Sequence, residues 1–302
     1  MEGQKITVGI AAYNEERGIA GSIGSALDSS PKVGEVLVVA SGCTDRTADI
    51  TREMAKEDGR IRLILEKERG GKGSAINLIL RNAKGSLIVM TDGDLTFPEH
   101  SINELALRMV KGVGAVSGRP EYFAASPMFS WWGRFASECA SRQREKGEKL
   151  GYHAISGYLY ALRKGAVTRI PPRARSEDAY VGQIVRQAGY EIRYAKRAVV
   201  NVGYAENIMD YLTQKIRTHY GHLEVFQEAG ANGPMKTAIM AGGIRGEMKE
   251  YFRVASSHIT SPIEYGYFAL YLLVEFSVWV MAFLKFYFRE EEKWKQIRST
   301  KK

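Results

Sequence analysis

Two acidic residues flank a glycine directly behind a short apolar run, and this spacing has a clear capacity for chemistry. The run is Leu87–Met90, and Asp92, Gly93 and Asp94 follow it. Carboxylates spaced in this way can reach one hard cation, and Mg²⁺ or Mn²⁺ then completes its shell with water and phosphate oxygens. Such an ion neutralises the charge that develops on a diphosphate leaving group. A D-G-D triplet also makes an ordinary turn, so its meaning depends on its place in the fold.

Short β-branched runs alternate with helical patterns through the first hundred residues. The predicted strands are Ile6–Ile10, Glu35–Val39, Ile61–Leu65 and Leu87–Met90, with helices over about 15–29, 46–57 and 73–82. This order predicts an α/β fold, a mostly parallel sheet with helices on both faces. Ligands of such sheets bind beyond the carboxyl ends of the strands, where polar clusters stand at Asn14–Arg17, Ser41–Asp45 and Asp92–Asp94. Thr44 or Asp45 is predicted to cap the second helix.

Two basic side chains have the surroundings of a phosphate site. Lys72 stands in a glycine-rich turn that opens a helix, where backbone N–H groups and an ammonium group can bind phosphate. Gln214 and Arg217 lie one helical turn apart, and arginine offers fixed donors to diphosphate oxygens. A solvated loop lysine and an exposed helical arginine are the plain alternatives.

Seven segments of the chain resemble, in the same order, the motifs of family 2 glycosyltransferases, a large inverting class with the Rossmann-like GT-A fold. They are I-T-V-G-I-A-A-Y-N-E-E (Ile6–Glu16), V-L-V-V-A-S-G-C-T-D-R-T-A (Val36–Ala48), G-G-K-G-S-A-I-N (Gly70–Asn77), S-L-I-V-M-T-D-G-D (Ser86–Asp94), S-G-Y-L-Y-A-L-R (Ser156–Arg163), S-E-D-A-Y (Ser176–Tyr180) and Q-K-I-R (Gln214–Arg217). Each segment is loose, but seven in order are specific, and together they cover about residues 5–225.

The resemblance implies a donor site for a UDP- or GDP-sugar. The residues that it and the local chemistry assign to the nucleotide are Tyr13, Glu15, Ser41, Lys72, Asp92, Gln214 and Arg217, with Asp94 and Asp92 as ligands of Mg²⁺ or Mn²⁺. The family's second strand normally ends in an acid that holds the base or ribose. Ala40 and Ser41 stand there in this chain, and a serine offers a weaker hydroxyl contact, so the sequence leaves the choice of base open.

The resemblance also places a general base at Asp178. An inverting transfer needs a carboxylate to take the proton from an acceptor hydroxyl as its oxygen attacks the anomeric carbon. Glu177 is the alternative base, and both residues also suit the first turn of a helix, where negative charge is favourable. A base favours a hydroxyl acceptor on a lipid-linked or surface glycan. A polyprenyl phosphate arrives ionised and needs no base, so a polyprenyl-phosphate sugar synthase stays the alternative.

The last part of the chain differs in composition. We expect a GT-A domain over residues 1–228 and a helical segment over 229–302 that associates with a membrane through the apolar stretch Tyr265–Phe288. Glu275 interrupts this stretch and would add to the cost of a plain span, and the cations that follow favour the cytosolic side. These features predict an in-plane or re-entrant helix on the cytoplasmic face of the cell membrane, while a true span or a buried core helix stays open.

The net charge of +9 suits a polyanionic partner such as an anionic membrane or a phosphorylated ligand. No stripe of alternating basic and aromatic residues is visible, so we expect no nucleic-acid partner. Two cysteines make neither a disulfide framework nor a zinc cluster and indicate a reducing compartment, as does the polar N-terminus without a signal-peptide pattern. The sequence allows a homo-oligomer. A nucleotidyltransferase and a non-catalytic basic membrane-binding module are the alternatives from other classes.

Overall fold

The computed structural model describes residues 5–150, 155–228 and 248–288. Contacts divide the chain into two units, which are described separately. The first combines Met1–Pro120 with His153–Val202, and the second combines Glu121–Tyr152 with Gly203–Lys302. The predicted division after residue 228 stays a prediction, because residues 229–247 lie outside the described part.

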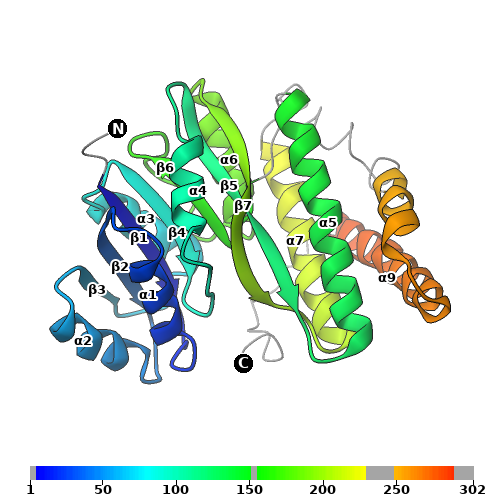
Figure 1. Cartoon of the computed structure of the whole chain (residues 1–302), viewed down its shortest axis with the longest axis horizontal. Helices are drawn as coiled ribbons and strands as arrows, with labels where there is room; N and C mark the ends of the chain where they lie inside the picture. Colours follow the sequence, from blue (N-terminus) through cyan, green and yellow to red (C-terminus); the bar gives the residue numbers. More distant parts are fainter. Residues whose placement is uncertain (1–4, 151–154, 229–247, 289–302) are drawn as a thin grey trace. The chain divides into compact units, whose positions relative to one another are not determined.

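A seven-stranded sheet in the order β3-β2-β1-β4-β6-β5-β7 forms the framework (Figure 1). Its strands are β1 (Ile6–Ala12), β2 (Val33–Ser41), β3 (Ile61–Glu66), β4 (Leu87–Asp92), β5 (Val113–Phe123), β6 (Leu159–Arg163) and β7 (Glu191–Gly203). Strands β1 to β4 are parallel, whereas β6 pairs antiparallel with β4 and β5. The four predicted strands are confirmed. The sheet is mixed, and its parallel half brings the carboxyl ends of β1, β2, β3 and β4 to one edge.

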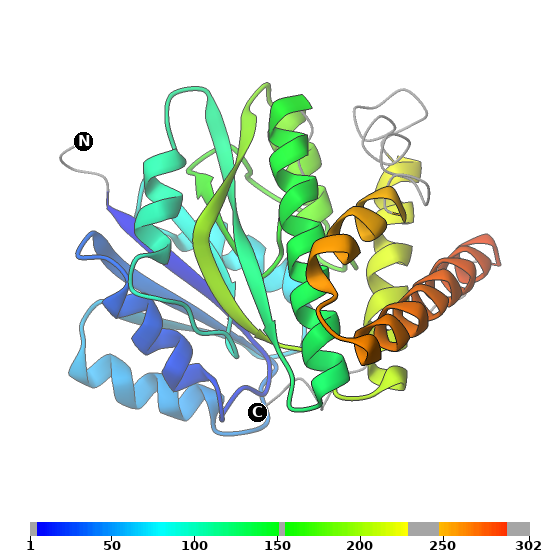
Figure 2. The same ribbon diagram turned by 45° about the vertical axis from the view of Figure 1, so that its right-hand side comes forward.

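Helices pack on both faces of the parallel half (Figures 1 and 2). The helices of the first unit are α1 (Ile19–Asp28), α2 (Thr47–Glu57), α3 (Lys72–Asn82), α4 (Ser101–Arg108) and α6 (Glu177–Gln187). The predicted cap of α2 needs correction, since Arg46 occupies the N-cap position. Asp45 lies one residue earlier, and its carboxylate accepts a hydrogen bond from the backbone N–H of Thr47 at 3.0 Å, which still satisfies the first turn.

The amino-terminal edge of the parallel strands holds a buried carboxylate, Glu35 on β2. It accepts hydrogen bonds from the Thr7 hydroxyl at 2.6 Å and the Lys84 backbone N–H at 2.9 Å, and it pairs with the guanidinium of Arg62. Burial raises the pKa of Glu35, but these hydrogen bonds and the charge of Arg62 outweigh burial and lower the pKa below its ordinary value. Glu35 therefore ties three strands together as a fully paired charge.

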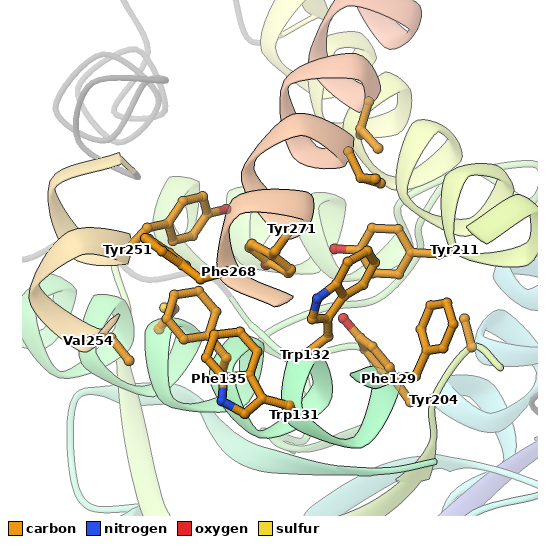
Figure 3. Packing of buried hydrophobic residues seen from close by; sticks show 14 of the residues in the cluster. Phe129, Trp131, Trp132, Phe135, Tyr204, Tyr211, Tyr251, Val254, Phe268 and Tyr271 are labelled. Carbon is orange, nitrogen blue, oxygen red and sulfur yellow. The ribbon is translucent and has the colours of Figure 1, made fainter. Parts of the chain in front are cut away.

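The second unit is helical and has an aromatic core. It contains α5 (Pro127–Leu150), α7 (Ile208–Glu228), a helix over residues 248–258 and α9 (Pro262–Tyr287). Figure 3 shows rings from all four helices packed edge to face, among them Trp132 against Tyr211 and Tyr271 at centroid distances of 5.3 and 5.4 Å. Such pairs contribute about 0.5–1.5 kcal/mol each beyond the area that they bury.

Helix α9 is the one described helix that is long and apolar enough to cross a membrane, judged by length and composition. Glu275 lies on its buried face and is 3% exposed. The Tyr211 hydroxyl of α7 donates a hydrogen bond to it, and the ammonium of Lys215 lies 3.8 Å away. Figure 2 shows α9 beside α7. The free-energy cost of placing Glu275 in a membrane, which the sequence predicted, therefore does not apply, because its carboxylate faces protein.

Candidate active site

The D-G-D turn lies at the carboxyl edge of the sheet, where β4 ends beside β1. Asp92 is the last residue of β4, and the backbone N–H of Gly93 continues the pairing with β1 by donating to the Ala11 carbonyl at 3.1 Å. A Cβ on Gly93 would lie 3.0 Å from side-chain atoms of both Ala12 and Glu15. Only glycine fits this space without a shift, so the turn fixes the two aspartates on either side of a tightly packed residue.

Lys72 lies at the centre of the site. Its ammonium pairs with Oδ2 of Asp92 at 2.8 Å and Oε1 of Glu177 at 2.7 Å, and it donates to the Gly157 carbonyl at 3.1 Å. An ammonium group has three donors, and these three acceptors use all of them. Burial lowers the pKa of Lys72, but the two carboxylate charges outweigh burial and hold the pKa well above its ordinary value. The predicted phosphate contact stays a prediction, and in this arrangement Lys72 holds two acids in place.

Burial disfavours the charged form of both aspartates of the turn. It raises the pKa of Asp92 to about 6, although the charge of Lys72 acts in the opposite direction, and it also raises the pKa of Asp94. Oδ1 of Asp92 is buried and makes no hydrogen bond to any described residue. An unpaired buried carboxylate oxygen is costly, which makes Oδ1 of Asp92 a candidate for binding a ligand.

A hard divalent cation fits these groups. Among the described residues, no cluster of three or more His, Cys, Asp or Glu side chains has metal-binding geometry. The free oxygen of Asp92 and the carboxylate of Asp94 thus provide a two-residue oxygen set. Mg²⁺ is commonly bound by one or two carboxylates together with substrate phosphates, and such a set suits Mg²⁺ or Mn²⁺ better than zinc.

The Glu177–Asp178 pair opens α6, and the structure gives its members different partners. Glu177 is buried and its Oε1 is held by Lys72. Oδ1 of Asp178 accepts from the Ser176 hydroxyl at 2.8 Å and the Ala179 backbone N–H at 2.9 Å, while its Oδ2 has no hydrogen-bond partner in the described chain. A Cβ on Gly157 would lie 3.2 Å from Oδ2 of Asp178. Both acids therefore lie in the first turn of α6, where negative charge is favourable, and Oδ2 of Asp178 is directed at Gly157.

The predicted nucleoside contacts gather at the ends of β1 and β2. The guanidinium of Arg69 stacks 3.8 Å from the ring centroid of Tyr13. Glu15 is buried beneath the D-G-D turn. The hydroxyl of Ser41 donates to the carboxylate of Glu66, the last residue of β3. The sheet thus brings Tyr13, Glu15 and Ser41 to one edge with Asp92 and Asp94.

A family model described as "Glycosyl transferase family 2" matches residues 7–170, which is more than half of the chain. The chain belongs to glycosyl transferase family 2. The matched range includes β1 to β4, the D-G-D turn and Lys72, and it ends before Glu177.

Relatives of this family 2 member agree with that placement. The chain is 31% identical over 150 residues to glycosyltransferase AglD of Haloferax volcanii, covering 48% of this chain and 22% of that protein. It is 30% identical over 153 residues to undecaprenyl-phosphate 4-deoxy-4-formamido-L-arabinose transferase of Edwardsiella ictaluri, covering 49% and 46%. Among solved structures, the mannosyltransferase PcManGT of Pyrobaculum calidifontis, in complex with GDP-Man and Mn²⁺, aligns with a TM-score of 0.71 at 21% identity, covering 95% and 88%. The last match confirms the GT-A fold, and the chain spans less than half the length of either curated relative.

Gln214 and Arg217 of this family 2 chain lie on successive turns of α7 in the second unit. The Thr218 hydroxyl donates to the Gln214 carbonyl at 3.0 Å. The predicted nucleotide contacts of both residues stay predictions.

Two residues near the site were missed by the sequence analysis. Tyr160 on β6 pairs with Met90 of β4, and its buried hydroxyl has no hydrogen-bond partner in the described chain. Burial raises the pKa of Tyr160, and the charge of Glu177 adds to that rise. Glu66 is the other. Tyr160 stood within the S-G-Y-L-Y-A-L-R segment and was available as a signal, whereas nothing in the sequence separated Glu66 from an ordinary strand end.

Proposed function

We propose that the chain transfers a sugar, with inversion, from a nucleoside diphosphate sugar to a hydroxyl acceptor, and that the transfer depends on Mg²⁺ or Mn²⁺. One observation carries this proposal. Two carboxylate oxygens of the first unit, Oδ1 of Asp92 and Oδ2 of Asp178, have no hydrogen-bond partner among the described residues, while the other oxygen of each acid is bound. The relative from Pyrobaculum, named as a complex with GDP-Man and Mn²⁺, supports the same donor chemistry.

Each acid then has a distinct task. Asp94 and Asp92 would hold the cation, which supplies positive charge to the diphosphate leaving group. Asp178 would accept the proton of the attacking hydroxyl at Oδ2, while Ser176 keeps Oδ1 in place. Glu177 is the weaker candidate for the base, because the ammonium of Lys72 occupies its Oε1. Lys72 would fix the distance between the donor-side acid Asp92 and the acceptor-side acid Glu177.

The proposal is tested by measuring which phosphate product the protein releases from a panel of UDP- and GDP-sugars with Mn²⁺ and candidate acceptors. We expect nucleoside diphosphate, and we expect Asp178→Asn to keep donor affinity while turnover falls by about a thousandfold, within the usual range for loss of a general base. Glu177→Gln is the matched variant. Normal turnover of Asp178→Asn together with loss in Glu177→Gln would assign the base to Glu177. Release of pyrophosphate from UTP or GTP with a sugar 1-phosphate, and no nucleoside diphosphate from the sugar nucleotides, would identify a nucleotidyltransferase instead.

A phosphate acceptor is the second candidate, because the Edwardsiella relative is named as an undecaprenyl-phosphate transferase. An ionised phosphate attacks without a general base. Asp178→Asn should then reduce turnover with a polyprenyl phosphate by less than about tenfold, far below the loss expected for removal of a base. The same variant thus separates the two acceptor classes when both are assayed side by side.

We further propose that α9 lies in the plane of the cytoplasmic leaflet of the cell membrane. The exposed side chains of this helix include Leu273, Phe276, Phe283 and Tyr287, and apart from Glu275 its charges, Glu264 and Lys285, stand in its first and last turns. The Ser277 hydroxyl donates a hydrogen bond within the helix, to the Leu273 carbonyl at 2.8 Å. The opposite face, with Glu275, packs on protein. A helix with one face bound to protein, a largely apolar face outward and charges at its ends suits an interfacial position, which would bring the site to a lipid-borne acceptor.

Vesicle flotation and thiol labelling of a Ser299→Cys variant test this proposal. We expect the full chain to float with anionic vesicles, and Leu273→Glu/Phe283→Glu to abolish flotation without lowering the Tm. In sealed inverted vesicles, whose cytoplasmic face points outward, an impermeant thiol reagent should label the introduced thiol from outside, and the unsubstituted chain gives the background from its own two cysteines. Labelling of the introduced thiol only after permeabilisation would establish a true span. A full chain that stays soluble without vesicles or detergent would identify α9 as a core helix.

A further inference from the structure

Glu66 brings a carboxylate to the place where the carboxyl ends of β2 and β3 meet. The hydroxyl of Ser41 donates to one of its oxygens, and the hydroxyl of Ser74, in the first turn of α3, donates to the other. Glu66 makes no ion pair in the described chain, and the residue is half-buried. The two serines fix the plane of the group without neutralising its charge.

The segment that follows β3 is connected to this carboxylate through Ser41. The backbone N–H of Gly70 donates to the Ser41 hydroxyl at 3.2 Å, which connects Glu66 to the segment that carries Arg69. At Gly42, where φ is +63°, a Cβ would lie 2.6 Å from the backbone nitrogen of Arg69, so only glycine lets the two turns approach. The guanidinium of Arg69 in turn stacks on Tyr13. An aromatic ring and a guanidinium plane beside an anchored acid have the composition of a site for a planar heterocycle.

The chemistry of the acid favours one base over another. A carboxylate has about four acceptor positions, and the two serines use two of them. Guanine presents two donors on one edge, N1–H and the N2 amino group, which match the two oxygens of one carboxylate. Uracil presents one donor, N3–H, between two carbonyl oxygens that would face the carboxylate with like partial charge.

We infer that Glu66 is a specificity-determining residue that binds the N1–H and N2-amino edge of guanine, so that the donor is a guanosine diphosphate sugar. This inference rests on the proposed function, because it assigns the base of the same donor. Ser41 then acts through Glu66 by holding its carboxylate, and its own contact with the base is secondary.

Calorimetric titration of the full chain with GDP, IDP and UDP in the presence of Mn²⁺ tests the assignment. IDP keeps N1–H and lacks the N2 amino group, so it removes one of the two hydrogen bonds. We expect affinity to fall from GDP to IDP to UDP. In Glu66→Gln the affinity for GDP should fall by about tenfold to hundredfold, the usual worth of a hydrogen bond to a charged group, while UDP affinity changes by less than about threefold and the GDP–IDP difference disappears.

Two further variants keep the result interpretable. Glu57→Gln removes the same charge from an exposed position of α2 and should leave all three affinities unchanged. Ser74→Ala keeps the carboxylate but removes one of its two anchors, so it should give a smaller loss for GDP even if Glu66→Gln folds poorly. A wild type that prefers UDP, or an unchanged GDP–IDP difference in Glu66→Gln or Ser74→Ala, would overturn the inference and leave the proposed transfer intact. A wild type that binds none of the three nucleotides would overturn the proposed function as well.

Discussion

The two edges of the parallel half-sheet each hold an acid, a buried one at the amino-terminal edge and a half-buried one at the carboxyl edge, and the two acids have opposite surroundings. Glu35 at the amino-terminal edge receives hydrogen bonds from Thr7 and Lys84 and the charge of Arg62, and its pKa is lowered. Asp92 at the carboxyl edge keeps one buried oxygen without a partner in the described chain, and its pKa is raised to about 6. The first arrangement stabilises the fold. The second costs folding free energy, which the proposed binding of a cation at Asp92 would offset.

The largest effect in this comparison should come from removing the paired acid. Glu35→Ala leaves Arg62 and two strand-edge groups without this partner. Loss of one member of a fully buried ion pair typically costs about 3–5 kcal/mol, and because the Arg62 side chain is 35% exposed we expect a cost near the lower end of that range. Urea unfolding monitored by circular dichroism measures this change. Glu53→Ala, on the exposed side of α2, is the matched control and should stay within about 0.5 kcal/mol of the wild type. Equal stability of the two variants would mean that the amino-terminal edge does not depend on its buried charge.

A smaller effect, on rate and not on folding, is expected at Lys72. Lys72→Met releases Asp92 and Glu177, and displacement of acids around a reacting centre can cost about 10–100-fold in turnover. Donor affinity should change by less than about threefold if Lys72 acts through these acids. Steady-state kinetics with separate donor titrations measure both quantities, with the exposed Lys56→Met as control. A loss of donor affinity as large as the loss of turnover would instead support the direct phosphate contact that the sequence predicted.

The smallest expected effect is a gain in stability, when the ionisable group of Asp92 is removed. The pKa of Asp92 rises from an ordinary 3.8 to about 6, so the folded state binds this proton more tightly than the unfolded state. Stability therefore falls as the pH rises from about 4 to 6, and the deficit persists above pH 6. Asp92→Asn removes the ionisation and should be about 1–2 kcal/mol more stable than the wild type in urea unfolding at pH 7.5, with little gain at pH 4. A variant that is less stable than the wild type at pH 7.5 would show that the pair with Lys72 outweighs the cost of burial.

Much of this half-sheet was predictable from short patterns. The four parallel strands were found because each is a short apolar run followed by a polar turn, and Asp92 and Asp94 were found because they follow such a run. Glu177 and Asp178 were found through the S-E-D-A-Y segment that resembles a family motif. The partners of Lys72 were not predictable, since the residues that it bonds lie 20 to more than 80 positions away along the chain. Only the antiparallel insertion of β6 beside β4 brings Gly157 to that point.

The buried position of Glu275, by contrast, could have been predicted from the sequence. The buried residues of α9 include Phe268, Tyr271, Glu275, Val278 and Ala282, which recur every three or four positions and therefore share one helical face. A count of apolar residues along the stretch treats Glu275 as an interruption. The helical period instead places it on the face that meets α7, where Tyr211 and Lys215 supply its partners.

Mn²⁺ titration followed by electron paramagnetic resonance, with and without GDP, tests the central claim that Asp92 and Asp94 at the carboxyl edge form the cation site. We predict one tightly bound Mn²⁺ per wild-type chain when GDP is present and much weaker binding without it, because only two carboxylates serve the ion. Asp94→Asn should lose this binding while keeping the wild-type circular dichroism spectrum, and Glu35→Gln, where it folds, should keep the binding. Unchanged Mn²⁺ affinity in Asp94→Asn would contradict the account.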